Sequence, residues 1–138
     1  KLDDLDEIVT LFRKYPKIFP HLRPQTLEQS IENNKLVWMK NVAIQFMEYQ
    51  KTTNKGGFIC KKGDIQLIKM VSGRGLASEV FDSWVLDLRA KAPGRIILSV
   101  RKENTRAIQF YKSRGFEKVG EQEWGKDKIK GLVMKLDY

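Results

Sequence analysis

The sequence has 138 residues, of which 41% are hydrophobic, and its formal net charge is +9. This length favours one domain with a packed core, and no apolar run approaches the roughly 18 residues that a membrane span requires. No signal-peptide pattern opens the chain, although a start at Lys1 without methionine leaves open whether residues precede it. A single cysteine, Cys60, excludes an internal disulfide and suits a reducing cytoplasm, and with one histidine it disfavours a structural zinc site.

The positive charge is concentrated in the second part of the chain. Residues 1–50 contain seven Lys+Arg and seven Asp+Glu, whereas residues 51–138 contain 19 and 10. This asymmetry indicates an anionic ligand or partner for the second part. A basic surface that only keeps the protein soluble is the alternative, and charge by itself does not separate the two.

The first third of the chain predicts two helices followed by two strands. Leu2–Lys14 has an apolar face and acidic residues at its start, where the helix dipole favours them. A second helix begins near Thr26, which Gln29 follows at the spacing of a capping box. The two strands are predicted at Leu36–Met39 and Val42–Tyr49.

Turn residues separate the short strands of this region. Asn41 is the turn candidate between the first two strands. Thr53–Gly57 is predicted as a loop and Phe58–Cys60 as a third strand, which Lys62-Gly63 connects to the next one. Consecutive short strands with tight connections are typical of antiparallel pairing.

A strand, a glycine-rich turn and a helix follow one another in the middle of the chain. Asp64–Val71 is the strand, Ser72–Gly75 is the turn, and the apolar residues from Leu76 to Leu88 fall on one helix face. A helix that begins after such a turn exposes unpaired N–H groups beside backbone without a Cβ, which is a site for an anion, most often a phosphate. A tight turn with a purely structural role explains the glycines equally well.

The last part of the chain completes a mixed sheet. We expect a strand at Arg95–Val100, a helix at Asn104–Arg114 that Gly115 ends, and strands at Phe116–Trp124 and Gly131–Leu136. The central strand, helix and strand in succession imply parallel neighbours. The predicted fold is therefore α/β, with a mixed central sheet of about seven strands, antiparallel at both ends and parallel near its middle, and helices on both faces.

One segment closely resembles a known family. Residues 104–116 read NTRAIQFYKSRGF, which matches the segment of GCN5-related N-acetyltransferases written N-x-x-A-x-x-F/L-Y-x-x-x-G-F. The order of elements agrees along almost the whole chain. The acyl-CoA pyrophosphate loop of the family, Q/R-x-x-G-x-G/A, aligns with Ser72–Ala77, and Ser72 departs from its first position. The first three strands match by pattern only.

The resemblance implies a single N-acetyltransferase domain, residues 1–138, which transfers the acetyl group of acetyl-CoA to a primary amine by direct attack in a ternary complex. In the family, the strands equivalent to Asp64–Val71 and Arg95–Val100 splay apart around the thioester. N–H groups near Met70 and Val71 would then polarise the thioester carbonyl. The remaining residues that the resemblance assigns to acetyl-CoA binding are Gly73, Arg74, Gly75, Leu76, Ala77, Asn104, Ala107 and Tyr111.

The resemblance also implies a catalytic acid, Tyr111, which would protonate the departing CoA thiolate. A purely structural place in the core is the alternative for Tyr111, which lies four residues after Ala107 on the helix. A lysine-like amine is only about 0.04% neutral at pH 7, a handicap near 4.6 kcal/mol, so the site needs a base, a water or a dry pocket. Where the family often places a glutamate, the central strand offers only Gln66. The candidate bases are Glu48, which has the best strand placement, and Tyr49, His21 and Glu103.

Several alternatives stay open at this point. Asn104 would contact the pantetheine arm or an ordered water, or it is only a helix N-cap. A Rossmann fingerprint needs a glycine where Ser78 stands, and a Walker loop needs a Gly-Lys-Ser/Thr that is absent. The alternative function is a nucleic-acid-binding or nucleic-acid-modifying protein on the same scaffold, which charge alone supports. The acceptor amine is not identified, and a monomer and a homodimer are both compatible with the sequence.

Overall fold

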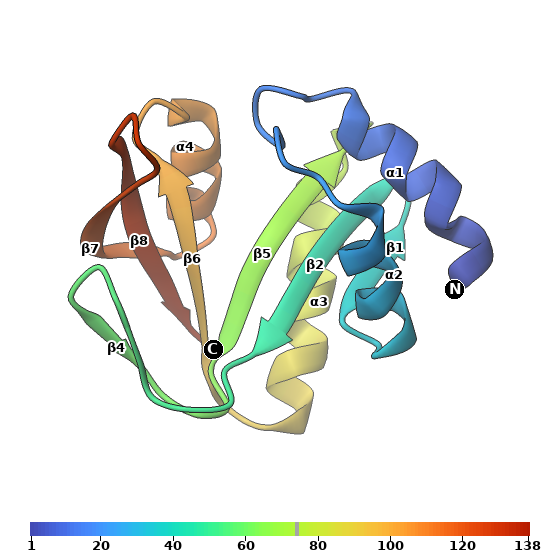
Figure 1. Ribbon diagram of the computed structural model, residues 1–138. Helices are drawn as coiled ribbons and strands as arrows, with labels where there is room; N and C mark the ends of the chain where they lie inside the picture. The colour runs from blue at the N-terminus through green and yellow to red at the C-terminus, as the bar shows by residue number, and fades with distance from the viewer. Residues whose placement is uncertain (74) are drawn as a thin grey trace. The chain divides into compact units, whose positions relative to one another are not determined.

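Figure 1 shows the computed structural model of the protein, which describes residues 1–73 and 75–138. The chain forms two compact units, each built from separate stretches of sequence. The first unit consists of Lys1–Met47 and Leu67–Asp87, and the second of Glu48–Gln66 and Leu88–Tyr138. The single domain over residues 1–138 stays a prediction. Among the described helices, none has both the length and the apolar composition that a membrane crossing requires.

The elements follow the predicted order with one addition. The helices are the short 3₁₀ turn η1 (Leu2–Asp4), α1 (Leu5–Arg13), α2 (Pro24–Glu32), α3 (Ala77–Lys91) and α4 (Thr105–Ser113). The strands are β1 (Leu36–Met39), β2 (Val42–Glu48), β3 (Thr53–Lys55), β4 (Phe58–Cys60), β5 (Ile65–Ser72), β6 (Arg95–Arg101), β7 (Glu117–Trp124) and β8 (Ile129–Asp137). The prediction of a loop over Thr53–Gly57 was wrong for its first three residues, which form β3.

The strands form a six-stranded sheet in the order β1-β2-β5-β6-β8-β7 and a separate ladder of β3 and β4. Pairing is antiparallel between β1 and β2, β6 and β8, and β7 and β8. It is parallel between β5 and β6, through Ile65 with Ile96 and Gln66 with Ile97. The predicted mixed α/β class is therefore confirmed, with the eight described strands divided between two sheets.

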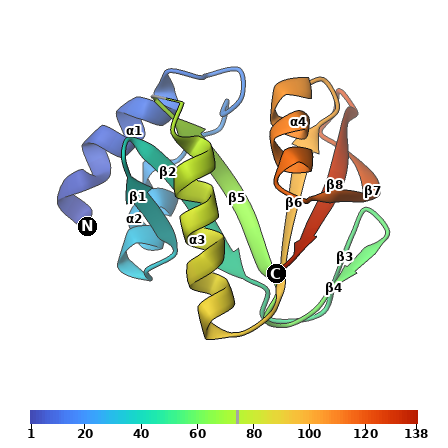
Figure 2. The same cartoon turned by 180° about the vertical axis from the view of Figure 1, so that it is seen from behind.

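In the first unit, helices cover both sides of the strands. α3 lies behind β2 and β5 in Figure 1 and in front of them in Figure 2, and α2 lies on the opposite side. On the α3 side, Trp84 packs against Phe46 and Phe81, with ring centroids 5.0 and 5.8 Å apart. On the other side, Ala43 and Val71 join a cluster with buried residues of α1 and α2. β2 is thus buried on both faces, which explains its run of apolar residues.

In the second unit, the β3–β4 hairpin packs against β7 and β8. Its Gly56 has φ +58°, and a Cβ there would come within 2.6 Å of the Glu121 carbonyl oxygen and 2.8 Å of Val133. Glycine therefore permits both the turn and the close approach to the sheet. Buried Tyr49 and Cys60 cluster with Val133 in the same unit.

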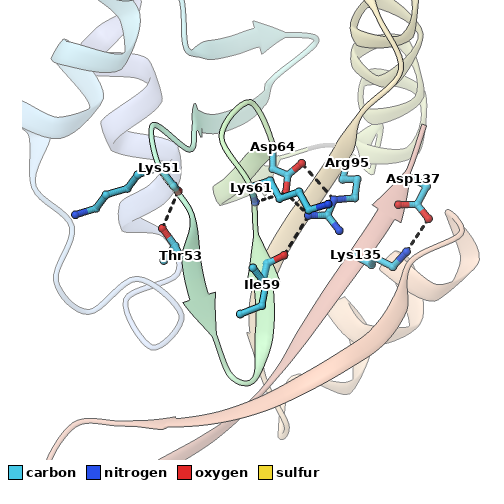
Figure 3. A network of polar contacts seen from close by, with 8 residues as sticks. All are labelled: Lys51, Thr53, Ile59, Lys61, Asp64, Arg95, Lys135 and Asp137. Atoms are coloured by element: carbon cyan, nitrogen blue, oxygen red, sulfur yellow. Dashed lines mark hydrogen bonds and ion pairs between the residues drawn. The ribbon is translucent and has the colours of Figure 1, made fainter.

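An ion pair closes the base of this hairpin (Figure 3). The Asp64 carboxylate, only 8% exposed, accepts hydrogen bonds from both Nε and Nη2 of Arg95 and from the Lys61 N–H. The same guanidinium donates to the Ile59 carbonyl oxygen at 3.2 Å and lies 4.9 Å from the centre of the Phe58 ring. Its hydrogen bonds to Asp64 raise the pKa of Arg95, so the guanidinium keeps its positive charge. Asp64 and Arg95 therefore fasten β4 to the start of β5 and β6.

Asp64→Asn should lower the free energy of unfolding by about 2–3 kcal/mol. The amide loses the charge of the carboxylate and turns a donor toward the partly buried guanidinium of Arg95. Urea unfolding measures the change. Asp137→Asn is the matched control, because Asp137 also accepts from a cation, Lys135 at 2.6 Å, but its side chain is 62% exposed. That control should cost less than about 1 kcal/mol, and equal losses in both variants would contradict the structural role of Asp64.

Candidate functional site

The glycine-rich turn of the first unit contains backbone donors without an acceptor in the described part of the chain. β5 ends at Ser72 and α3 begins at Ala77, with the Leu76 carbonyl oxygen accepting the first helical hydrogen bond from Val80. Gly75 has φ +70°, and a Cβ on it would meet no atom within 4 Å. The N–H groups of Gly75 and Leu76 make no hydrogen bond to any residue that the structure describes. This arrangement suits an anion. Arg74 lies outside the described residues.

Two residues before Gly75 do not offer donors to a ligand. The Gly73 N–H donates to the Asn41 carbonyl oxygen at 3.0 Å and is therefore engaged within the protein. The Ser72 hydroxyl is buried and has no partner in residues 1–73 or 75–138. Ser72, where the family has Gln or Arg, thus turns its side chain inward. With Gly73 engaged, the predicted phosphate contacts that remain among the described residues are Gly75, Leu76 and Ala77.

Met70 and Val71 lie near the end of β5 in the same unit. Val71 is buried in the cluster with α1 and α2, and Met70 is half-buried. Parallel pairing of β5 with β6 is recorded only for Ile65 and Gln66, so it includes neither residue. The role of their N–H groups at a thioester stays a prediction.

Asn104 caps α4 in the second unit. Its side-chain oxygen Oδ1 accepts a hydrogen bond from the Ala107 N–H at 3.2 Å. Asn104 is therefore the N-cap of α4, whatever its role toward a ligand, and the Ala107 N–H is already satisfied. The Asn104 Nδ2 group makes no hydrogen bond within the described chain, so the amide could still donate to a ligand.

Tyr111 lies one turn further along α4 with its ring in the core. The side chain is 7% exposed, and the ring meets Phe110 and Phe116 edge to face at centroid distances of 5.5 and 5.3 Å. Burial raises the pKa of Tyr111, so the phenol is protonated at neutral pH. Its hydroxyl has no hydrogen-bond partner among the described residues. The ring therefore packs in the core while the hydroxyl keeps a proton that it can donate.

The family model described as FR47-like protein matches residues 50–125 of this chain. The chain belongs to the FR47-like family. The match runs from the β3–β4 hairpin through the glycine turn and α3 to the end of β7, so it includes the turn, Asn104 and Tyr111. Together with the solved structures of similar fold, it places the chain in the GCN5-related N-acetyltransferase superfamily.

Several solved N-acetyltransferases share this fold. The ribosomal-protein-alanine N-acetyltransferase from Brucella melitensis is 14% identical, with a TM-score of 0.72 over 100% of this chain and 96% of that one. Ard1 from Thermoplasma volcanium is 16% identical, with a TM-score of 0.71 over 96% and 92%. Arabidopsis thaliana Naa50, in complex with the bisubstrate analogue CoA-Ac-MVNAL, is 18% identical, with a TM-score of 0.57 over 94% and 93%. A search of the curated proteins finds no match.

The predicted bases of this FR47-like protein differ in their surroundings. Glu48 is exposed at the end of β2, and His21 is exposed between α1 and α2. Glu103 is exposed and pairs with Arg101 at 3.7 Å. Tyr49 is buried beside Cys60, and burial together with the contact to the Cys60 thiol raises its pKa, which keeps it protonated and unfit as a base at neutral pH. Glu48 stays the predicted base.

One residue that the sequence analysis passed over is Lys69 of β5. Its side chain is half-buried, and burial lowers its pKa. It makes no ion pair with any described residue. Alternation along the strand puts Lys69 on the same face as Leu67 and Val71, which are buried, and this is the signal that marks it as unusual. No group of metal-ligating side chains gathers in the described part of the chain.

The structure brings the predicted residues together in two sets. The first set runs from the end of β5 to the start of α3 in the first unit and consists of Met70, Val71, Gly73, Gly75, Leu76 and Ala77. The second set belongs to α4 and its N-cap in the second unit and consists of Asn104, Ala107 and Tyr111. The same unit also contains Glu48. Asn104 and Ala107 are in direct contact through the N-cap hydrogen bond.

Proposed function

We propose that this protein is an enzyme, an acetyl-CoA-dependent N-acetyltransferase that transfers an acetyl group to a primary amine by direct attack in a ternary complex. The observation that carries the proposal is the family match across residues 50–125, which contains both the glycine turn and the Asn104–Phe116 segment. Acetyl transfer is the chemistry of the superfamily. The solved Naa50 structure contains a CoA-peptide bisubstrate analogue, which supports the same donor and an amine acceptor here.

The residues of the turn fit the pyrophosphate of acetyl-CoA. Open space faces Gly75, and free N–H groups lead into α3, whose fifteen residues carry an appreciable positive dipole at that end. We assign pyrophosphate binding to Gly75, Leu76 and Ala77. Arg74 stays among the proposed contacts, and Gly73 acts by shaping the turn, since its own N–H is engaged.

The other roles follow the chemistry of thioester aminolysis. Acetyl-CoA supplies an activated acetyl group with a thiolate as leaving group. We assign the N–H groups of Met70 and Val71 to the developing oxyanion and the Tyr111 hydroxyl to protonation of the thiolate. Asn104 and Ala107 hold the start of α4, and Nδ2 of Asn104 donates to the pantetheine arm. Glu48, or a water that it orders, takes the proton of the amine.

Acetyl-CoA should stabilise the protein against heat. At 100 times its dissociation constant a ligand adds about 2.7 kcal/mol, which for a chain of this size raises the melting temperature by at least about 5 °C. Scanning calorimetry with acetyl-CoA, CoA and pantetheine measures the shift, and pantetheine, which lacks the pyrophosphate, should give little. No shift with millimolar acetyl-CoA or CoA would contradict the proposal.

A second experiment, filter binding of nucleic acid, tests the nucleic-acid alternative, which still rests on charge alone. Filter binding of labelled RNA or DNA across a salt series should show only weak association that falls steeply with salt, as expected of any basic protein. A radiolabelled acetyl-CoA assay over a panel of amines and peptides then identifies the acceptor.

A further inference from the structure

The turn between β1 and β2 has a backbone shape that few residues adopt. Lys40 and Asn41 have φ values of +50° and +59°, both in the left-handed region. A two-residue hairpin turn of this kind requires positive φ at both positions, and Asn is one of the few residues other than glycine that tolerates it. The sequence analysis identified Asn41 only as a turn residue.

This hairpin turn contacts the glycine turn of the same unit at Gly73. The Gly73 N–H donates to the Asn41 carbonyl oxygen at 3.0 Å. The Asn41 carboxamide lies against the Gly73 Cα, so that a Cβ on Gly73 would clash with Asn41 Nδ2, and Leu11 Cδ1 would be 3.1 Å from the same Cβ. Asn41 therefore holds Gly73 by a backbone hydrogen bond and by packing, with Leu11 against the same point.

A second contact joins the hairpin turn to the start of α3. The Lys40 ammonium pairs with the carboxylate of Glu79, the third residue of α3. Both side chains are about half exposed, at 48% and 57%, so this pair alone contributes little. It is nevertheless a second contact between the hairpin turn and this region, and Glu79 lies two residues beyond Ala77, the last predicted phosphate contact.

The contact borders a cavity as well as the core residue Leu11. The cavity has a volume of about 420 Å³ and is lined by Glu7, Trp38, Lys40, Asn41 and Leu76. Removing the Asn41 carboxamide would enlarge this existing space and leave the core clusters intact. The contact can therefore be cut without the large loss of stability that a new void in the core would cause.

We propose that Asn41 is a positioning residue for the phosphate-binding turn. By fixing Gly73 from one side, it sets the conformation in which Gly75 has φ +70° and the N–H groups of Gly75 and Leu76 find no acceptor among the described residues. This inference rests on the proposed function, since it concerns the affinity of that turn for CoA. It adds a residue 32 positions away in the sequence, on a different element, to the determinants of cofactor binding.

Asn41→Gly tests the inference, because glycine keeps the left-handed turn and its carbonyl group but removes the carboxamide. The dissociation constant for CoA, measured by titration calorimetry, should rise about tenfold, within the range of coupling that contacting residues show. The urea midpoint should stay close to that of the parent. Asn34→Gly is the matched control: Asn34 has φ +56° at the end of α2 in the same unit, and it should bind CoA like the parent.

A double-mutant cycle with Gly73→Ala distinguishes positioning from a general loss of structure. In the parent the new methyl group pushes the Asn41 carboxamide away, so Gly73→Ala should weaken CoA binding. In the Asn41→Gly background the methyl group enters the vacated space, so the same change should cost less and restore part of the affinity.

The outcomes are distinguishable from failure of the proposed function. If the parent binds CoA and Asn41→Gly binds it equally well, the inference is overturned and the proposed function stands. If Asn41→Gly and Asn34→Gly lose affinity equally, or if the effects of Gly73→Ala and Asn41→Gly simply add, the positioning role is also wrong. If the parent itself fails to bind CoA or acetyl-CoA, the proposed function falls and the inference falls with it.

Discussion

Tyr111→Phe should lower kcat by about 10²–10⁴-fold, the usual contribution of general acid catalysis, with little change in acetyl-CoA affinity. The substitution keeps the ring, which packs edge to face with Phe110 and Phe116, and removes only the hydroxyl. Because that hydroxyl has no partner among the described residues, its loss breaks no described hydrogen bond. The fold should therefore persist, and stability should change by less than about 1 kcal/mol.

Steady-state kinetics with any amine that the parent acetylates measures this effect. Tyr49→Phe is the matched control, because Tyr49 is also 7% exposed and lies in the same unit, and the change again removes only a phenol hydroxyl. It should leave kcat within about twofold of the parent. A kcat for Tyr111→Phe within about threefold of the parent would contradict the catalytic role and leave Tyr111 with a structural one.

The protonation of Tyr111 adds a pH dependence with a definite sign. Burial raises its pKa above the ordinary value of 10.0, so the folded protein keeps the phenol neutral where the unfolded chain would lose its proton. Its contribution to stability is complete below pH 10 and is lost as the pH rises through the range between the unfolded and folded values. The parent should thus show no fall in kcat from ionisation of Tyr111 at pH 7–9.

Sequence patterns predicted the elements whose signals are local. The apolar spacing from Leu76 to Leu88 predicted α3, and Gly115, with φ +99°, ends α4 as its position indicated. β3 was missed because Thr53, Asn54 and Lys55 show no alternation of apolar and polar residues. Its ladder with β4 depends instead on the turn at Gly56 and on packing against β7 and β8, which are distant in the sequence.

The residues of the candidate site show the same difference between local signals and contacts that arise on folding. The turn and the α4 segment are each an unbroken run of residues, so both can be recognised from one sequence alone. The engagement of Gly73 by Asn41, the inward hydroxyl of Ser72 and the half-buried Lys69 depend on contacts or burial that arise only on folding. A glycine in a motif therefore does not reveal whether a ligand or a neighbouring side chain requires it. In the structure, neighbouring side chains require glycine at position 73, whereas at position 75 no described atom lies near the missing Cβ.

Gly75→Val should weaken CoA binding by about 10- to 100-fold. Gly75 combines φ +70° with open space around its missing Cβ, so the folded protein has room for a side chain and only the backbone conformation opposes one. A β-branched residue in that conformation costs about 1–2 kcal/mol and shifts the turn. Its methyl groups would also stand where the pyrophosphate approaches the N–H groups, and losing one hydrogen bond to a charged group costs about 1.5–3 kcal/mol.

Two further variants separate these causes. Gly75→Asn adopts positive φ more readily than valine, so it should keep stability closer to that of the parent and still lose CoA affinity through the bulk of its side chain. Gly125→Val is the control for strain alone, since Gly125 has φ +78° and equally open surroundings in the β7–β8 turn. It should lose stability by a similar amount and bind CoA normally. Calorimetric titration beside urea unfolding decides the matter: if Gly75→Asn binds CoA as tightly as the parent, the pyrophosphate does not approach Gly75, and the turn is structural.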